Sequence, residues 1–95
     1  MDAEEDIGEA VEFYRRQYGE AAAESLLHSF YTAFQLLAEY PLIGRPRPDV
    51  RRDLRSFSIP SYVILYSDME AHVYIARVLH QRRDVRKAFR EKNSG

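Results

Sequence analysis

A group of cationic side chains and one histidine lie at the end of the last apolar segment of the chain. Arg77 lies within this segment and His80 ends it. Arg82 and Arg83 follow directly. Such residues suit the binding of an anionic partner. They also suit RNA cleavage, which needs the 2′-hydroxyl deprotonated, the phosphorane charge stabilised and the leaving oxygen protonated.

Each of these residues also has an ordinary structural interpretation. A histidine at a strand end is more often a solvated or hydrogen-bonded structural residue than a catalytic one. Arg77 has apolar neighbours, so it must either pair with a buried carboxylate or open onto an exposed face. Arg82 and Arg83 equally suit a solvated basic patch. The same holds for the arginines of a preceding loop, namely Arg45, Arg47, Arg51, Arg52 and Arg55.

The composition predicts one small globular domain. The chain has 95 residues, no cysteine and a formal net charge of -1. The absence of cysteine excludes disulfides and thiolate metal sites, and nothing indicates a cofactor. No apolar run reaches the roughly 18 residues of a membrane-spanning helix, and the acidic start does not resemble a signal peptide, so we expect a cytoplasmic protein. Acidic residues predominate before position 46 and basic residues after it, which suits an anionic partner or internal neutralisation.

Residues 1–40 show the periodicity of two amphipathic helices. The first apolar stripe consists of Ala3, Ile7, Val11, Tyr14 and Tyr18. After Gly19 the pattern resumes, and Pro41 ends it. The second stripe consists of Ala23, Leu26, Leu27, Phe30, Phe34, Leu37 and Tyr40. The spacing therefore predicts a helical hairpin.

The second half of the chain predicts an antiparallel sheet. Residues 41–53 hold three prolines and a glycine, which favours an ordered basic loop. Residues rich in β-branched and aromatic side chains then predict a meander over 54–80 with strands at 54–59, 62–66 and 72–80. The basic tail 81–95 suits a short helix from Asp84 onward. We expect an α+β domain with the hairpin on one face of the sheet and the other face open.

Four segments in this order resemble ParE-like toxins of the RelE/ParE superfamily of type II toxin-antitoxin systems. They are Tyr40–Pro46, Leu54–Phe57, Tyr62–Tyr66 and Val73–Asp84. The Arg-Val-Leu-His that ends the last strand, with the arginines and Asp84 just after it, is the most specific part. The likeness extends from about Ala3 to about Phe89.

The resemblance implies a growth-inhibiting toxin, of the kind associated with plasmid stabilisation, held inactive by a cognate antitoxin. ParE-like members are associated with poisoning of DNA gyrase, whereas RelE-like members cut messenger RNA in the ribosome. The first interpretation is binding without turnover chemistry. It assigns target or antitoxin contacts to Arg55, Arg77, His80, Arg82 and Arg83. A decayed, non-toxic member of the superfamily is a further alternative.

The nuclease alternative has weaker support from the residues. At the positions where RelE-like nucleases typically have lysines, this chain has Leu54 and Ser56. Val63 stands at the first arginine, and residues 88–89 replace the tyrosine, so that Arg82 is the one match. Other nuclease branches use a histidine at the end of the last strand. The nuclease hypothesis therefore assigns catalysis to His80, Arg77 and Arg82.

The chain departs from the superfamily at its start, where members normally have a short strand beside the last one. The pattern of residues 72–79 is apolar on both faces, which is typical of a strand with two neighbours. A bare apolar edge invites pairing with another chain. We therefore expect either an upstream start codon or a homo-oligomer that forms through strand 72–79.

Overall fold

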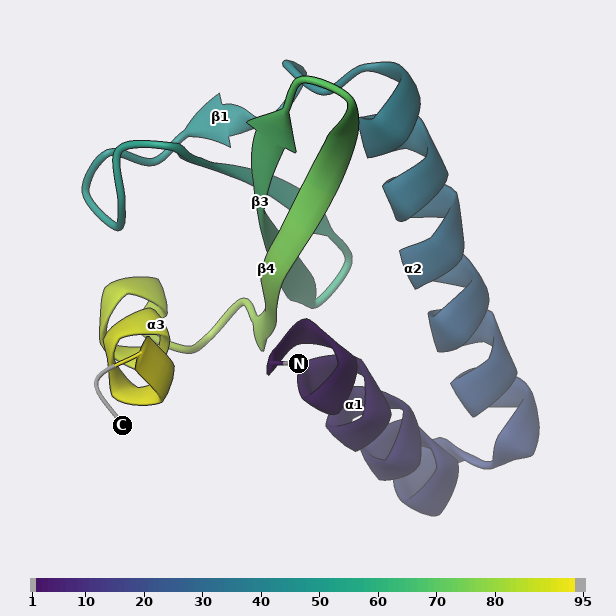
Figure 1. Ribbon diagram of the computed structural model, residues 1–95. Helices are drawn as coiled ribbons and strands as arrows, with labels where there is room; N and C mark the ends of the chain where they lie inside the picture. Colours follow the sequence, from purple (N-terminus) through teal and green to yellow (C-terminus); the bar gives the residue numbers. More distant parts are fainter. Residues whose placement is uncertain (1, 94–95) are drawn as a thin grey trace.

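The computed structural model describes residues 2–93 and has a sheet that lies between a helical hairpin and a short helix (Figure 1). Two helices come first, a four-stranded antiparallel sheet follows, and a short helix ends the described chain. In chain order the elements are α1 (Asp2–Tyr18), α2 (Glu20–Glu39), β1 (Arg45–Pro46), β2 (Leu54–Ile59), β3 (Tyr62–Met69), β4 (His72–His80) and α3 (Val85–Asn93). This arrangement confirms the predicted α+β fold.

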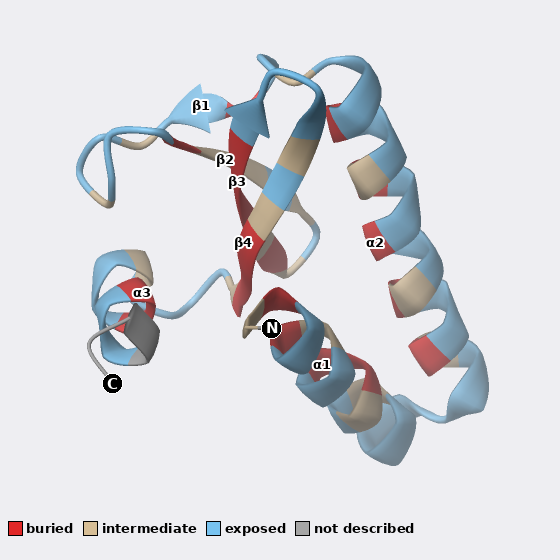
Figure 2. Ribbon diagram, viewed as in Figure 1, coloured by how far each residue is buried: buried red, intermediate tan, exposed pale blue. Residues whose placement is uncertain are grey.

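The helical hairpin forms where the periodicity predicts it. Gly19 joins the two helices at a φ of 95°, a backbone conformation that glycine adopts without steric cost. Both helices turn their apolar stripes toward the sheet, as the buried residues in Figure 2 show. The main core joins the stripes to β3 and β4 and contains Ala10, Val11, Ala23, Leu26, Phe30, Ala33, Leu37, Tyr62, Ile64, Tyr66 and Val78. Tyr18 departs from the prediction, because it is 66% exposed.

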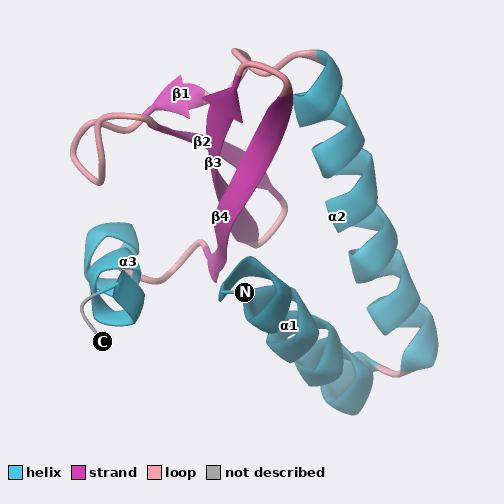
Figure 3. Ribbon diagram, in the orientation of Figure 1, coloured by secondary structure: helices cyan, strands magenta, loops and turns pink. Residues whose placement is uncertain are grey.

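The sheet has one more strand than the sequence predicts. Its order is β1-β2-β3-β4, and all neighbours are antiparallel (Figure 3). The additional strand β1 lies inside the segment expected to be a loop, where Arg45 and Pro46 pair with β2. A proline fits there because β1 is an edge strand. The β3–β4 hairpin also runs further than expected, to Met69.

A β-bulge in β4 changes which residues face the helices. Leu65 pairs with Arg77 and Tyr66 with Ile75, so Ala76 has no partner residue on β3. Before the bulge, Ile75 packs into the main core. After it, Val78 does so. The extra residue thus moves Arg77 off the helix-facing side, where strict alternation would have placed it.

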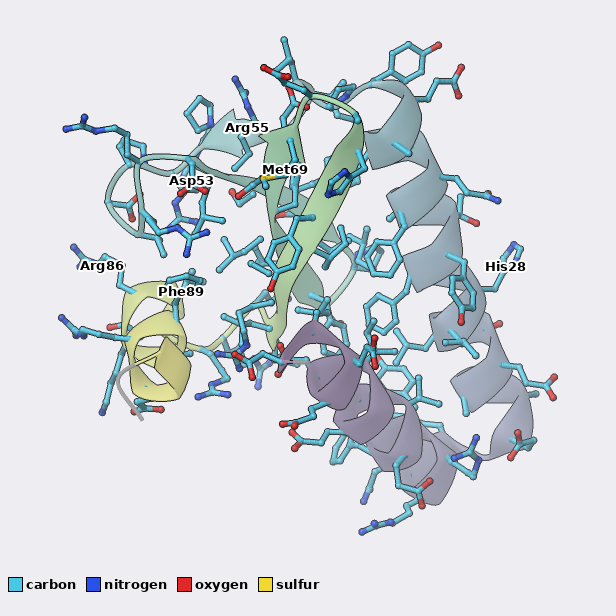
Figure 4. All side chains as sticks on the ribbon, viewed as in Figure 1. His28, Asp53, Arg55, Met69, Arg86 and Phe89 are labelled. Carbon is cyan, nitrogen blue, oxygen red and sulfur yellow. The ribbon has the colours of Figure 1, made fainter. Side chains whose placement is uncertain are left out.

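The second face of the sheet is not open, contrary to the sequence-based expectation. Helix α3 packs on it and forms a smaller core that contains Leu54, Leu65, Ala76, Leu79, Ala88 and Phe89. Figure 4 shows Phe89 rising from α3 toward the loop before β2, whereas Arg86 points away. The Arg51 guanidinium lies over the Phe89 ring, with its carbon 5.3 Å from the ring centroid. This helix buries its few apolar side chains because the sheet offers an apolar face.

The loop after α2 is fixed by two side chains from the sheet. The buried Tyr66 hydroxyl donates to the Pro41 carbonyl and accepts from the Gly44 N–H, both at 2.8 Å. Arg55 donates to the Gly44 carbonyl at 2.8 Å and to the Leu42 carbonyl at 3.3 Å. A side chain at position 44 would overlap the Tyr66 ring, so the close approach requires glycine. Within residues 2–93, no helix is long and apolar enough to cross a membrane.

Candidate binding groove and the basic turn after strand β4

Arg77 is an internal residue, which corrects its assignment to the binding or catalytic surface. Its side chain is 2% exposed and that of Asp6 is 7% exposed. The Arg77 Nε and Nη2 atoms donate to the two carboxylate oxygens of Asp6, at 2.7 and 3.0 Å, and Nη1 donates to the Ala88 carbonyl at 2.9 Å. These hydrogen bonds to the Asp6 carboxylate raise the pKa of the Arg77 guanidinium. The sequence left two alternatives for Arg77, an ion pair with a buried carboxylate or exposure on an open face. The structure shows the ion pair.

Asp6 also closes part of the sheet edge that the sequence left bare. Its Oδ2 atom accepts the backbone N–H of Val78 at 2.9 Å. The start of α1 thus lies against the carboxyl end of β4, as Figure 1 shows. A second chain pairing along the whole of strand 72–79 would have to displace this bond. An oligomer that forms through this strand would therefore have to pair along residues 72–75, which lie away from the Asp6 carboxylate.

His80 holds the turn that follows β4. Its Nδ1 atom accepts the N–H of Arg82 at 3.2 Å, so this nitrogen carries no proton while the bond is made. The imidazole also packs edge-on against Tyr62, its partner across the strands, with ring centroids 5.4 Å apart. Both contacts are those of a structural residue. Of the two imidazole nitrogens, Nε2 alone is left for a partner.

Arg82 and Arg83 lie on a turn whose backbone is held at three points. The Gln81 N–H donates to the Ser61 carbonyl at 2.9 Å, and the Arg83 N–H donates to the His80 carbonyl at 3.0 Å. The third point is the bond from Arg82 to His80. Arg83 lies 3.6 Å from Glu91, and both side chains are about half exposed, so this pair is weak. The turn therefore presents two exposed guanidinium groups from a fixed backbone.

Arg55 does not join this group. It lies on β2 beside the loop after α2, and its bonds to two carbonyls of that loop give it a structural role. In Figure 4 it lies beside β1, at the end of the sheet opposite α1. Two of the other loop arginines form ion pairs within the loop. Arg47 pairs with Asp49 and Arg51 with Asp53. The structure thus brings together His80, Arg82 and Arg83 of the five predicted site residues.

A groove of about 590 Å³ opens beside the basic turn, between α1 and the end of β4. Its lining includes the rings of Phe13, Tyr14, Tyr18 and Tyr62. Tyr14 contacts Tyr18 and Tyr62, with centroid separations of 5.2 and 6.4 Å. Burial raises the pKa of Tyr62, and the neighbouring phenols of Tyr14 and Tyr18 add to the shift, so the hydroxyl stays protonated at neutral pH.

Two groups of site residues were missed by reasoning from the sequence. Phe13 directly precedes Tyr14 but is not part of the apolar stripe of α1. A large apolar residue outside the stripe of an amphipathic helix signals an exposed aromatic ring. Asp6 lies on the buried side of α1, three residues after Ala3 and four before Ala10. An acid in phase with buried alanines signals a buried partner, and Arg77 is the arginine that needs one.

Comparison with known proteins gives the family of this chain. A sequence model described as the ParE toxin of type II toxin-antitoxin system, parDE, matches residues 1–85. The chain is also similar to Toxin ParE3 of Caulobacter vibrioides, with 34% identity over 64 residues. This match covers 67% of the chain and 64% of that relative, somewhat less than two thirds of its length. Because the family match extends over most of the chain, the protein belongs to the ParE toxin family of type II toxin-antitoxin systems.

Proposed function

We propose that this protein is the toxin of a type II pair and acts in the cytoplasm by binding its target, DNA gyrase, without turnover chemistry. A cognate antitoxin neutralises it. The observation that carries the proposal is the fixed turn that presents Arg82 and Arg83 beside an open aromatic groove. Family membership supports the class of function.

The geometry supports binding over RNA cleavage. The nuclease hypothesis needs Arg77, His80 and Arg82 around one phosphate. Arg77 is committed to Asp6 inside the fold, and the Nδ1 atom of His80 is committed to the turn. Residues 88–89 stand where RelE-like nucleases have a tyrosine, and residue 88 is a buried alanine that cannot replace it. Arg82 is the one member of the set whose charged group is exposed without an ion pair to a described residue.

Induced expression in a bacterial host, followed by assays on the purified protein, tests the proposal. We expect growth arrest, and we expect inhibited supercoiling or trapped cleaved DNA with purified gyrase. The double variant Arg82→Gln/Arg83→Gln should lose both effects, whereas Arg45→Gln, an exposed arginine at the far end of the sheet, should keep them. Cut messages that disappear in His80→Ala would instead favour the ribosome-dependent nuclease. Expression without arrest would favour the decayed toxin.

Pairing between two copies through residues 72–75 of β4 is a separate, smaller proposal. Tyr74 is 43% exposed there, and β4 is an edge strand of the sheet. Size-exclusion chromatography with light scattering tests it. A dimer at micromolar concentration that His72→Pro or Tyr74→Lys disrupts would support pairing, and a monomer would refute it.

A further inference from the structure

Helix α3 and the loop 47–53 form a basic surface on the face of the sheet opposite the helical hairpin. The two segments are in direct contact, because the Arg51 guanidinium of the loop lies over the Phe89 ring of α3. Four exposed cations on these segments form no ion pair with a residue that the structure describes, and we call them the α3 surface. They are Arg52, Arg86, Lys87 and Arg90.

Helix α3 directs its basic and its apolar side chains to opposite sides. Arg86 and Arg90 are four residues apart, so they lie on one side of the helix, about 6 Å apart along its axis. On the other side, Ala88 and Phe89 are buried in the smaller core. In Figure 4, Arg86 points away from the sheet and from α1. A ligand that approaches from this side therefore meets the arginines before the acidic first turn of α1.

The acidic side chains on these two segments already have local partners. The bonds from Arg47 lower the pKa of the Asp49 carboxyl most, and the charge of Arg86 adds a smaller effect. Arg86 is therefore not needed to neutralise this carboxylate. The local pairs are Asp49 with Arg47, Asp53 with Arg51, Glu91 with Arg83, and Asp84 with the Lys87 N–H.

The α3 surface lacks the features by which proteins or single strands are bound. A hollow of about 360 Å³ separates the loop from α3, and Arg86 and Arg90 line it. Every exposed large apolar side chain of the described residues lies outside loop 47–53 and α3. A protein interface needs apolar anchors, and single-stranded nucleic acids stack their bases on exposed aromatic rings. The phosphates of a duplex need neither, because cationic side chains alone can hold them.

We propose that the α3 surface binds the sugar–phosphate backbone of duplex DNA without reading its base sequence. Arg86 and Arg90 donate to phosphate oxygens at the hollow, and Lys87 and Arg52 contact flanking phosphates. The use of this contact rests on the proposed function. It would hold the toxin on the DNA on which gyrase acts, while the turn after β4 contacts the enzyme.

Fluorescence anisotropy of a labelled DNA duplex of mixed sequence, with no gyrase present, tests the inference. With about four phosphate contacts, we expect affinity to fall about 100-fold between about 50 and 200 mM salt. A second duplex of unrelated sequence should bind with the same affinity to within about twofold, because phosphate contacts carry no sequence information.

Matched variants locate the contact. Arg86→Gln/Arg90→Gln should weaken binding at least about tenfold at low salt and reduce the salt slope by about two. Arg15→Gln/Arg16→Gln removes the same charge from α1 and should change the affinity by less than about twofold. Circular dichroism checks that both variants are folded, and all four side chains are exposed.

Several outcomes would overturn the inference. The first is that the unmodified protein binds no duplex at low salt, and the second is that the α1 variant loses as much affinity as the α3 variant. Tighter binding of an oligothymidylate or of double-stranded RNA would also contradict it. Competition by hexaglutamate as effective as competition by DNA of equal charge would indicate an acidic protein segment instead.

The DNA assay and the toxicity assay fail separately. Salt-dependent DNA binding by a chain that neither arrests growth nor inhibits gyrase would refute the toxic function and leave the α3 surface assigned. Inhibition of gyrase by a chain that binds no DNA would refute the α3 surface and leave the function intact.

Discussion

Replacing Asp6 by asparagine should destabilise the protein far more than an ordinary change on the surface of a helix. Asparagine keeps the shape of the side chain and an oxygen for the Val78 N–H, but it removes the negative charge. The Arg77 guanidinium, in a side chain that is 2% exposed, then has no counter-charge. Breaking a buried ion pair from one side costs about 3–5 kcal/mol. That is a large part of the roughly 5–14 kcal/mol expected for a domain of this size.

Urea denaturation followed by far-ultraviolet circular dichroism measures this cost. At about 4–8 °C per kcal/mol, we also expect Tm to fall by more than about 10 °C. Glu12→Gln is the matched control, because Glu12 also accepts bonds from arginines on α1 but pairs at the exposed surface. It should cost less than about 1 kcal/mol.

A second variant separates charge from packing. Arg77→Met removes the buried cation and keeps an unbranched side chain, so Asp6→Asn/Arg77→Met holds no unpaired charge. The double variant should be less destabilised than the sum of the two single variants. If Asp6→Asn cost no more than Glu12→Gln, or if the two single effects simply added, the assignment of a buried ion pair would be refuted.

The remaining predictions concern the loop after α2 that Tyr66 and Arg55 fix, the two buried tyrosines and helix α3. Gly44→Ala should cost about 1–3 kcal/mol in urea denaturation because the new methyl group meets the Tyr66 ring and the Ser56 carbonyl, whereas Gly8→Ala, in open space on α1, should stabilise by about 0.5–1 kcal/mol; equal effects would contradict the clamp. Burial raises the pKa of both Tyr62 and Tyr66, so the stability that depends on their protonated hydroxyls is complete below the ordinary value of about 10 and is lost as pH rises through the higher values of the folded state. Ultraviolet titration of phenolate should show two tyrosines ionising late, and Tyr66→Phe should remove one of them. Phe89→Ala should cost about 3–5 kcal/mol and increase hydrogen exchange in α3, and unchanged exchange would mean that the ring does not hold the helix.

The helices and the strand order could be predicted because their signals are local. A stripe repeating every three or four residues and alternating apolar runs need no knowledge of distant contacts. Helix α3 had the same kind of signal, in Val85, Ala88 and Phe89, and the expectation of an open sheet face ignored it. An apolar stripe on a helix needs an apolar surface to bury it, and the second face of the sheet was the surface available.

The candidate site was predicted less well because its geometry depends on pairs far apart in the sequence. Asp6 and Arg77 are 71 positions apart, and neither residue alone identifies its partner. The groove likewise combines α1 with the turn after β4, so no contiguous motif contains it. Arg55 was predicted as a contact from its charge. Its bonds to the carbonyls of residues 42 and 44 could not be foreseen without the path of that loop.

The bulge at Ala76 links the fold to the proposed binding surface. With strict alternation, Arg77 would share a face with Ile75, and its charge would enter the main core under the helices. The extra residue turns Arg77 to the other face, where Asp6 and the Ala88 carbonyl satisfy it. The same shift brings His80 onto the helix-facing side, opposite Tyr62, and so fixes the turn that carries Arg82 and Arg83 beside α1. One irregular residue therefore makes one arginine structural and leaves the two that follow the strand exposed on the turn.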